Sequence, residues 1–185
     1  VVWRKLYANT QQGYDDWTQN FGTPPDILEL HSLPGSTKTI YLDFDGHVTR
    51  DSRWNTDYSN PNIITPTFSI DPDPTSFSLQ EKLFIEEVWE RVSEDFRPFN
   101  VNVTTQDPGV DAFVNAGGDD NQWGIRVVVG GSTYDWYTPV SNNTKAGVAY
   151  ARSFNNSEDE PVFVFTPALI SAQPIADIVS HLVGT

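Results

Sequence analysis

The chain has 185 residues, 38% of them hydrophobic and 13% aromatic, so it is long and apolar enough to form one folded domain with a sizeable core. Its formal net charge is -14 and its 11 Lys and Arg residues are scattered, which argues against nucleic acid or an anionic membrane surface as a partner, because both bind clustered basic residues. The absence of Cys excludes disulfides, thiolate metal sites and Cys nucleophiles, and no apolar run is long enough to predict a transmembrane helix. The absence of Met, including at position 1, indicates a processed or excised chain.

The first 35 residues predict an irregular arm that packs over the main body of the protein. Aromatic residues are scattered among polar ones there, and segments 23–25 and 33–35 break the chain with Pro and Gly. We therefore divide the chain into an N-terminal arm, residues 1–35, and one main domain, residues 36–185.

The main domain opens with a predicted strand and a long predicted helix. Residues 39–44 are β-branched and aromatic and predict a strand, whereas residues 46–76 are rich in Asn, Asp, Pro and Ser and predict a long loop. A helix is expected from about residue 79 to 96, because Ser78 and Glu81 match a capping box and apolar residues recur on one face.

Four further strands and a second main helix follow. The strands are predicted at residues 101–105, 126–130, 147–151 and 161–165, and the helix begins near Pro174, which suits a first helical turn. The strand–helix–strand unit implies a parallel crossover, and the short connections between the later strands imply one antiparallel member. The sequence thus predicts an α/β fold with a mixed sheet of about five strands and two main helices.

The last residues, Ser180-His181-Leu182-Val183-Gly184-Thr185, match in part the zinc-binding pattern His-Glu-x-x-His. In that pattern two imidazoles on one helical face bind zinc, and the Glu acts as general base toward the metal-bound water. Here His181 holds the first His position, whereas Leu182 stands at the Glu position and Thr185 at the second His position. Leu has no proton to exchange, and one imidazole alone does not hold zinc against water, so we expect no peptide hydrolysis by the chain as given.

Several segments together resemble secreted bacterial zinc metalloproteases of the metzincin-like (reprolysin-like) family. The segments are 40–49, 85–96, 98–105, 147–150 and 180–184. The resemblance spans residues 30–185 and is most specific over 85–105. It implies a three-layer arrangement with two main helices and a mixed sheet of about five strands, one of them an antiparallel edge strand. It also implies secretion, zinc as the family's metal and peptide bond hydrolysis as its activity. Family members carry a second and a third zinc-binding His and a Met-containing turn, none of which this chain has.

The antiparallel edge strand is where such proteases pair with an extended peptide substrate by strand addition. Here the resemblance assigns that strand to residues 147–154, and the contact residues to Gly147, Val148, Ala149 and Tyr150. Two functions follow as hypotheses. One is an extracellular metalloprotease-like domain with an incomplete zinc site. The other is a non-catalytic structural, adhesive or assembly module on the same fold, which pairs with a neighbouring chain at this edge.

Four aspartates are candidate ligands of calcium, which prefers hard oxygen donors. Asp43 and Asp45 stand at the end of the first predicted strand, and Asp71 and Asp73 lie in the loop that follows. Asp before Pro or Gly is also ordinary turn chemistry, and the sequence favours neither alternative. Calcium binding by these four aspartates is therefore one of two possible interpretations.

Asp43, Asp45 and Gly46 are also similar to the nucleophile strand of haloacid-dehalogenase-type phosphatases, in which the first Asp accepts phosphate and the second acts as acid and base. In that family a Thr or a close relative follows the Gly, where this chain has His47. The family's later Ser or Thr, Lys and paired Asp come in the reverse order in this chain. We therefore do not adopt this function.

Overall fold

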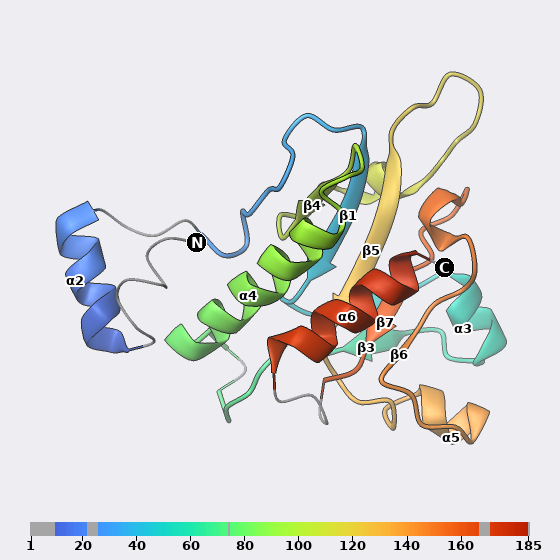
Figure 1. Cartoon of the computed structure of the whole chain (residues 1–185). Coiled ribbons are helices and arrows are strands. Elements are labelled where there is room, and N and C mark those ends of the chain that lie inside the picture. The colour runs from blue at the N-terminus through green and yellow to red at the C-terminus, as the bar shows by residue number, and fades with distance from the viewer. Residues whose placement is uncertain (1–9, 22–25, 74, 167–170, 185) are drawn as a thin grey trace.

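The computed structural model describes residues 10–21, 26–73, 75–166 and 171–184. The described chain is built on a sheet of five strands in the order β4-β1-β5-β7-β6, which Figure 1 shows with helices α4 and α6 in front of it. No helix within these ranges is long and apolar enough to cross a membrane.

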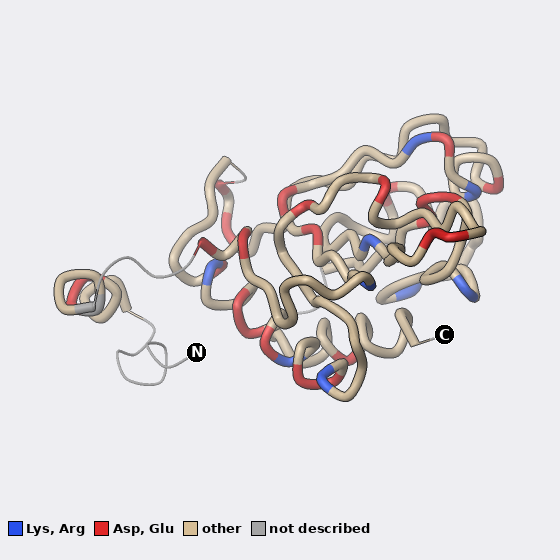
Figure 2. Tube along the Cα trace, turned by 90° about the horizontal axis from the view of Figure 1, so that it is seen from above, with Lys and Arg blue, Asp and Glu red and all other residues tan. Residues whose placement is uncertain are grey.

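Acidic residues are distributed along the whole described trace (Figure 2). The sequence has 25 Asp and Glu residues against 11 Lys and Arg residues, so negative charge dominates the protein. At long range this charge favours a neutral or basic partner over an acidic one.

The main sheet is mixed, with one antiparallel strand at an edge. Its members are β4 (Asn102–Thr104), β1 (Lys38–Asp43), β5 (Trp123–Val129), β7 (Val162–Val164) and β6 (Gly147–Val148). Neighbouring strands run parallel except β6, which is antiparallel to β7 and places Val148 opposite Phe163. The prediction of a mixed α/β fold with about five strands is confirmed.

Helix α4 (Leu79–Asp95) forms where the sequence predicted the first main helix. The Ser78 hydroxyl accepts from the Glu81 N–H at 3.4 Å, and the Glu81 carboxylate accepts from the Ser78 N–H at 2.8 Å, which completes the capping box. The same carboxylate accepts from the N–H of Ile70 at 2.8 Å and is fully buried. Glu81 therefore fixes both the helix start and the loop before it.

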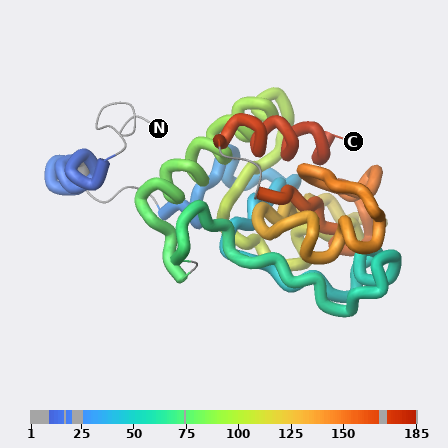
Figure 3. The backbone as a smooth tube through the Cα atoms, turned by 90° about the horizontal axis from the view of Figure 1, so that it is seen from below, coloured from blue at the N-terminus to red at the C-terminus, as the bar shows by residue number. Residues whose placement is uncertain are grey.

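Helix α6 (Ala172–Val183) lies beside α4, and the two helices cover one face of the sheet (Figure 3). The main core lies between them and the sheet. Its fully buried aliphatic side chains include Ile40, Leu42, Ile85, Val88, Val92, Val103, Val127, Val162, Val164, Ile175 and Val179. Burial of such apolar surface contributes roughly 25 cal/mol per Å² and is the main force that joins helices and sheet.

The opposite face of the sheet carries a different set of side chains, because side chains alternate along each strand. Tyr41 and Asp43 of β1 lie on this face with Arg126 of β5, which pairs with Tyr41 in the register. Farther across the sheet, Val128 and Phe163 belong to a second apolar cluster. The second face is therefore polar near β1 and apolar near β7.

The segment 46–76, predicted as a long loop, contains three short elements. They are β2 (His47–Thr49), α3 (Arg53–Asp57) and β3 (Ile63–Thr65), with β2 and β3 paired antiparallel. The prediction was wrong because strands of three residues are too short to show a periodic pattern. Trp54 of α3 packs on Phe163 with ring centroids 5.8 Å apart, so α3 covers the apolar part of the second face. The remaining short elements are η1 (Val110–Phe113), α5 (Tyr137–Ser141) and η2 (Ser153–Asn155).

The N-terminal arm contains a helix where an irregular structure was predicted. Residues Gln11–Phe21 form α2, which Figure 1 shows at the opposite end of the molecule from β6. Gln11 and Gln12 donate side-chain hydrogen bonds to Asp15 and Asp16 at 2.8 Å each, at the helical spacing of four residues. These local polar pairs stabilise a helix whose composition alone resembled a loop.

The end of the predicted arm belongs to the sheet. The N–H of Ser32 donates to the Val103 carbonyl at 3.0 Å, and the N–H of Thr105 donates to the Leu30 carbonyl at 3.1 Å. His31 forms an antiparallel bridge with Thr104 between these two bonds. Residues 30–32 therefore lie along the outer side of β4.

Strand β6 is much shorter than the predicted edge strand 147–154. The register of β6 on β7 places Tyr150 opposite Pro161, which has no N–H to donate. The Pro161 carbonyl is also occupied, because it accepts from the Trp54 indole N–H at 2.8 Å. Strand β7 thus offers residue 150 no N–H donor, and the chain turns away at Arg152, where φ is 71°.

Candidate functional site

The edge strand β6 lies directly on the last turns of α6. A Cβ atom on Gly147 would lie 2.7 Å from Cδ1 of Leu182 and 2.8 Å from Cγ2 of Ile178. Both distances are shorter than real side chains allow, so the close packing of strand on helix requires glycine here. The end of α6, which the resemblance implies is the zinc helix, therefore lies beside the edge strand.

The groups at the end of α6 do not fit a zinc ion. His181 is exposed on this helix, whereas Leu182, at the position of the general base, is half-buried under Gly147. Within the described ranges, no three His, Asp or Glu residues are placed so that they could hold one metal ion. The third predicted position, Thr185, lies outside the described residues. A protein zinc site uses four ligands, and here the His181 imidazole supplies one of them while its neighbour Leu182 supplies none.

The outer side of β6 is a free strand edge in the described part of the chain, because β6 ends the strand order. The Phe165 N–H donates to the Ala146 carbonyl at 2.8 Å, which identifies that pair as a hydrogen-bonded pair of the antiparallel ladder. Hydrogen-bonded and non-hydrogen-bonded pairs alternate, so Val148 bonds to β7 while Gly147 and Ala149 direct their N–H and C=O groups outward. Both residues are half-buried and accessible to a partner.

The residue after this outward row, Tyr150, is held by α3. Its ring centroid lies 4.0 Å from that of Trp54 and 4.1 Å from the guanidinium carbon of Arg53. Its hydroxyl donates to the Asp57 carboxylate at 2.7 Å. Burial, together with that carboxylate, raises the pKa of Tyr150, while the same hydrogen bond lowers the pKa of Asp57.

A group of charged side chains surrounds Arg126 on the polar part of the second sheet face. Its Nη1 donates to Asp43 at 3.0 Å and lies 3.9 Å from an oxygen of Asp107, and its Nε lies 3.4 Å from an oxygen of Asp159. The guanidinium carbon also lies 4.7 Å from the ring centroid of Phe113. Only 8% of the Arg126 side chain is exposed, so these carboxylates neutralise a buried charge.

Asp43 is the most perturbed acid of this Arg126 cluster. Burial and the neighbouring Asp45 raise its pKa to about 8, against the opposing effect of Arg126. Its Oδ1 is buried and has no donor among the described residues as long as both carboxyl groups are ionised. Burial is the largest cause of the high pKa, because an ionised carboxylate with an oxygen that no donor reaches loses its hydration without compensation.

His47 faces the same carboxylate from strand β2. Its Nδ1 lies 3.5 Å from Oδ2 of Asp43, yet burial and the charge of Arg126 lower its pKa to about 4. Burial opposes the charge of Arg126 too, but Asp159 and Asp43 hold the pKa of this guanidinium above its ordinary value. At neutral pH the imidazole is therefore neutral and the guanidinium charged.

The four candidate calcium ligands do not form one group in the described structure. Asp43 binds Arg126, whereas Asp71 accepts from the N–H of Asp73 at 2.8 Å, and Asp73 accepts from the N–H of Thr75 at 2.9 Å. The contacts of Asp71 and Asp73 are those of turn residues. Calcium binding by these four residues stays a prediction without a preformed cage.

The charge cluster at Arg126 was missed because its segment, 126–130, was interpreted as a short buried strand. A charged side chain in such a strand needs buried partners of opposite charge. The signal was the pair Asp43 and Asp45 at the end of another predicted strand, since alternation can place an Asp and an Arg of neighbouring strands on one face. The sequence alone did not say which strands are neighbours.

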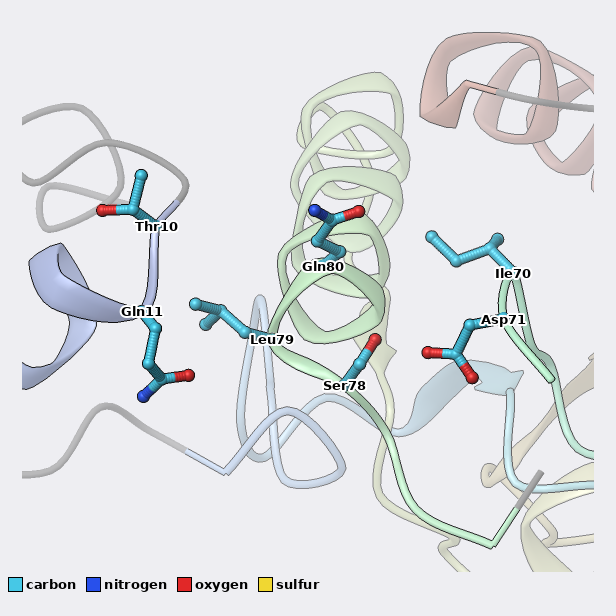
Figure 4. A pocket seen from close by; sticks show the side chains of 7 residues that line it. All are labelled: Thr10, Gln11, Ile70, Asp71, Ser78, Leu79 and Gln80. Carbon is cyan, nitrogen blue, oxygen red and sulfur yellow. The ribbon is translucent and has the colours of Figure 1, made fainter. Parts of the chain in front are cut away.

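A hollow of about 440 Å³ lies between the starts of α2 and α4 (Figure 4). Its lining residues are Thr10, Gln11, Ile70, Asp71, Ser78, Leu79 and Gln80. Asp71 is the one charged residue in this lining, and Figure 4 shows the side chains spread around the hollow and not gathered at one point. Among the described residues that line it, the hollow therefore has no set of groups suited to catalysis.

Comparisons with protein-family models, curated proteins and solved structures gave no match to this chain.

Proposed function

We propose that this chain is an extracellular metalloprotease-like domain that binds an extended peptide along β6 without hydrolysing it. The peptide adds as a further strand to the sheet. The extracellular location follows from the resemblance to secreted proteases, and zinc and hydrolysis are properties of that family which we do not assign to this chain.

The observation that carries the proposal is the outward row of backbone groups at Gly147 of β6 and at Ala149, the residue that follows β6. Gly147 and Ala149 present N–H and C=O groups that β7 does not use, and an extended peptide satisfies them by strand addition. The row lies where the resemblance implies a substrate-binding edge, next to the end of α6. Glycine at position 147 brings strand and helix together there.

The residue at the base position explains why the bound peptide stays intact. Hydrolysis by the family's chemistry requires a carboxylate that takes a proton from water, and Leu182 has none. Its aliphatic side chain packs under Gly147 instead. We expect recombinant protein to contain less than one zinc ion per chain by elemental analysis and to leave casein uncut. Stoichiometric zinc, with casein cleavage that a chelator abolishes, would contradict this part of the proposal.

Peptide binding is tested by fluorescence anisotropy with a labelled, extended peptide rich in Val and Thr and flanked by Lys. Basic flanks suit the negative charge of the protein. In the variant Ala149→Pro the outward N–H is lost while the bonds of Val148 to β7 are kept, because proline is tolerated at a strand edge. We expect binding by the wild type and by the control Ala149→Ser, and at least tenfold weaker binding by Ala149→Pro.

The other candidate occupant of the same edge is a neighbouring chain. If β6 pairs two copies of the protein, light scattering will give a dimer that Ala149→Pro dissociates and Ala149→Ser does not. A monomer that binds the peptide supports the proposal. A dimer that binds no peptide overturns it in favour of an assembly module.

A further inference from the structure

We infer that Tyr150 is a positioning residue, which locks the exit of β6 onto α3 and thereby holds the outward backbone groups of Ala149 in place for a partner strand. This inference rests on the proposed peptide binding and names the residue that prepares the edge for it.

The sheet alone provides few hydrogen bonds to Ala149 and Tyr150, the residues by which the chain leaves β6. Ala149 stands opposite Val162 in a pair without mutual hydrogen bonds, and Tyr150 stands opposite Pro161. Proline lacks the N–H that would bond to residue 150, and the Pro161 carbonyl already accepts from Trp54. Neither the Ala149–Val162 pair nor the Tyr150–Pro161 pair therefore holds the chain firmly on β7. The chain beyond Val148 needs another anchor.

Helix α3 supplies that anchor through three contacts with one side chain. Trp54 and the Arg53 guanidinium both lie close to the Tyr150 ring, with centroid distances of 4.0 and 4.1 Å. Asp57 accepts the phenolic hydrogen bond at 2.7 Å, and Arg53 Nε lies 3.1 Å from the same Asp57 oxygen. The tilted contact of the two rings, the cation–π contact of Arg53 and a charge-assisted hydrogen bond together favour one orientation of Tyr150.

Helix α3 is itself fixed to the start of β7. The N–H of Arg53 donates to the Glu160 carboxylate at 2.7 Å, and the Trp54 indole donates to the Pro161 carbonyl at 2.8 Å. Glu160 is 3% exposed, so this attachment is protected from water. Tyr150 contacts α3, and α3 is bonded to the residues just before β7. Through these contacts Tyr150 connects the residues after β6 to β7.

Ala149 lies between two fixed points, the Val148 pair with β7 and the Tyr150 contacts with α3. Its outward N–H and C=O are thus ordered before a peptide arrives. If the lock is removed, these groups must be ordered on binding. The added ordering weakens affinity by roughly three- to tenfold for one or a few rotatable groups.

The test compares Tyr150→Phe, which keeps the ring and removes the hydroxyl, with Tyr14→Phe on the distant helix α2 as the control. We expect Tyr150→Phe to bind the Val- and Thr-rich peptide about three- to tenfold more weakly, and Tyr14→Phe to bind it as the wild type does. Hydrogen exchange of the free protein should show faster exchange at the Ala149 amide in Tyr150→Phe alone.

A double variant separates positioning from a general loss of structure. If Tyr150 acts through Ala149, adding Tyr150→Phe to Ala149→Pro will weaken binding by less than Tyr150→Phe alone weakens it, because the positioned N–H is already gone and only the C=O is left to order. Additive losses, or unchanged affinity and exchange in Tyr150→Phe, overturn the inference while peptide binding by the wild type leaves the proposed function standing. Absence of peptide binding by the wild type overturns both.

Discussion

Arg126 is buried in the sheet because Asp43, Asp107 and Asp159 surround its guanidinium. Removing one partner of a buried ion pair leaves an uncompensated charge, whereas the pair as a whole contributes little net stability. The cluster also joins strands β1 and β5 to the loops that carry Asp107 and Asp159. Its main effect is therefore to fix these segments relative to one another.

In urea titrations above pH 8, where Asp43 is ionised, we expect Arg126→Met to lower the free energy of unfolding by about 3–5 kcal/mol, because Asp43 then loses its buried cation. The double variant with Asp43→Asn should recover part of this loss. The control is Arg91→Met, which breaks an exposed ion pair with Glu87. It should change the free energy of unfolding by less than about 1 kcal/mol. Equal effects of the two single variants would contradict a buried ion cluster.

Two perturbed groups near Arg126 make opposite contributions to stability as pH changes. Asp43 has a folded pKa of about 8, above its ordinary 3.8, so the free energy of unfolding falls as pH rises between these values. His47 has a folded pKa of about 4, below its ordinary 6.5, so its contribution rises with pH over that interval. The two effects oppose each other up to pH 6.5, and above it Asp43 acts alone.

We therefore expect the free energy of unfolding to fall between pH 6.5 and 8, by on the order of 1 kcal/mol per pH unit. Asp43→Asn is neutral at every pH and should lose this dependence. The measurement is urea denaturation at closely spaced pH values. A wild-type profile that is as flat as that of Asp43→Asn in this range would show that Asp43 is ionised throughout.

Among the elements, those with strong local signals were predicted well, whereas those fixed by distant partners were not. The start of α4 was predicted because Ser78 and Glu81 are close in sequence and form the cap together. The end of β6 could not be predicted, because it depends on Pro161 and on Trp54, which come from two distant segments. The pattern at residues 147–154 satisfied strand propensity, and tertiary contacts overrode it.

The packing of β6 on α6 gives a test at the scale of elements. We expect Gly147→Ala to destabilise the protein by about 1–3 kcal/mol in thermal or urea unfolding, because the new methyl group would overlap Leu182 and Ile178. Combining it with Leu182→Ala removes one of the overlapping groups. The double variant should therefore lose less stability than the sum of the two single variants, and strict additivity would show that the helix lies elsewhere.

For the whole molecule, the fold class followed from the order of predicted elements, but the arrangement of strands in the sheet did not. The parallel pairing of β1 with β4 was expected from the helix between them. The neighbours of β5 and the participation of residues 30–32 depend on contacts between distant segments, which periodicity does not encode. The Arg126 cluster was missed for the same reason.

Two truncations test where the folded unit begins. Removing residues 1–25 should leave the melting temperature within about 2 °C of the full chain, because the described hydrogen bonds of α2 are largely its own. Removing residues 1–35 also deletes the bonds of Leu30 and Ser32 to β4 and should lower it by roughly 5 °C or more. Calorimetry of the two proteins is the measurement, and equal melting temperatures would place residues 30–32 outside the folded unit.

The attachment of residues 30–32 to β4 has a consequence for crowded solutions. Among the described residues, the β4 border of the main sheet is already occupied by residues 30–32, whereas β6 leaves its outer side open to another backbone. When two copies pair at β6, each covers the free strand edge of the other. A contact between the two β6 edges is therefore expected to close at a pair.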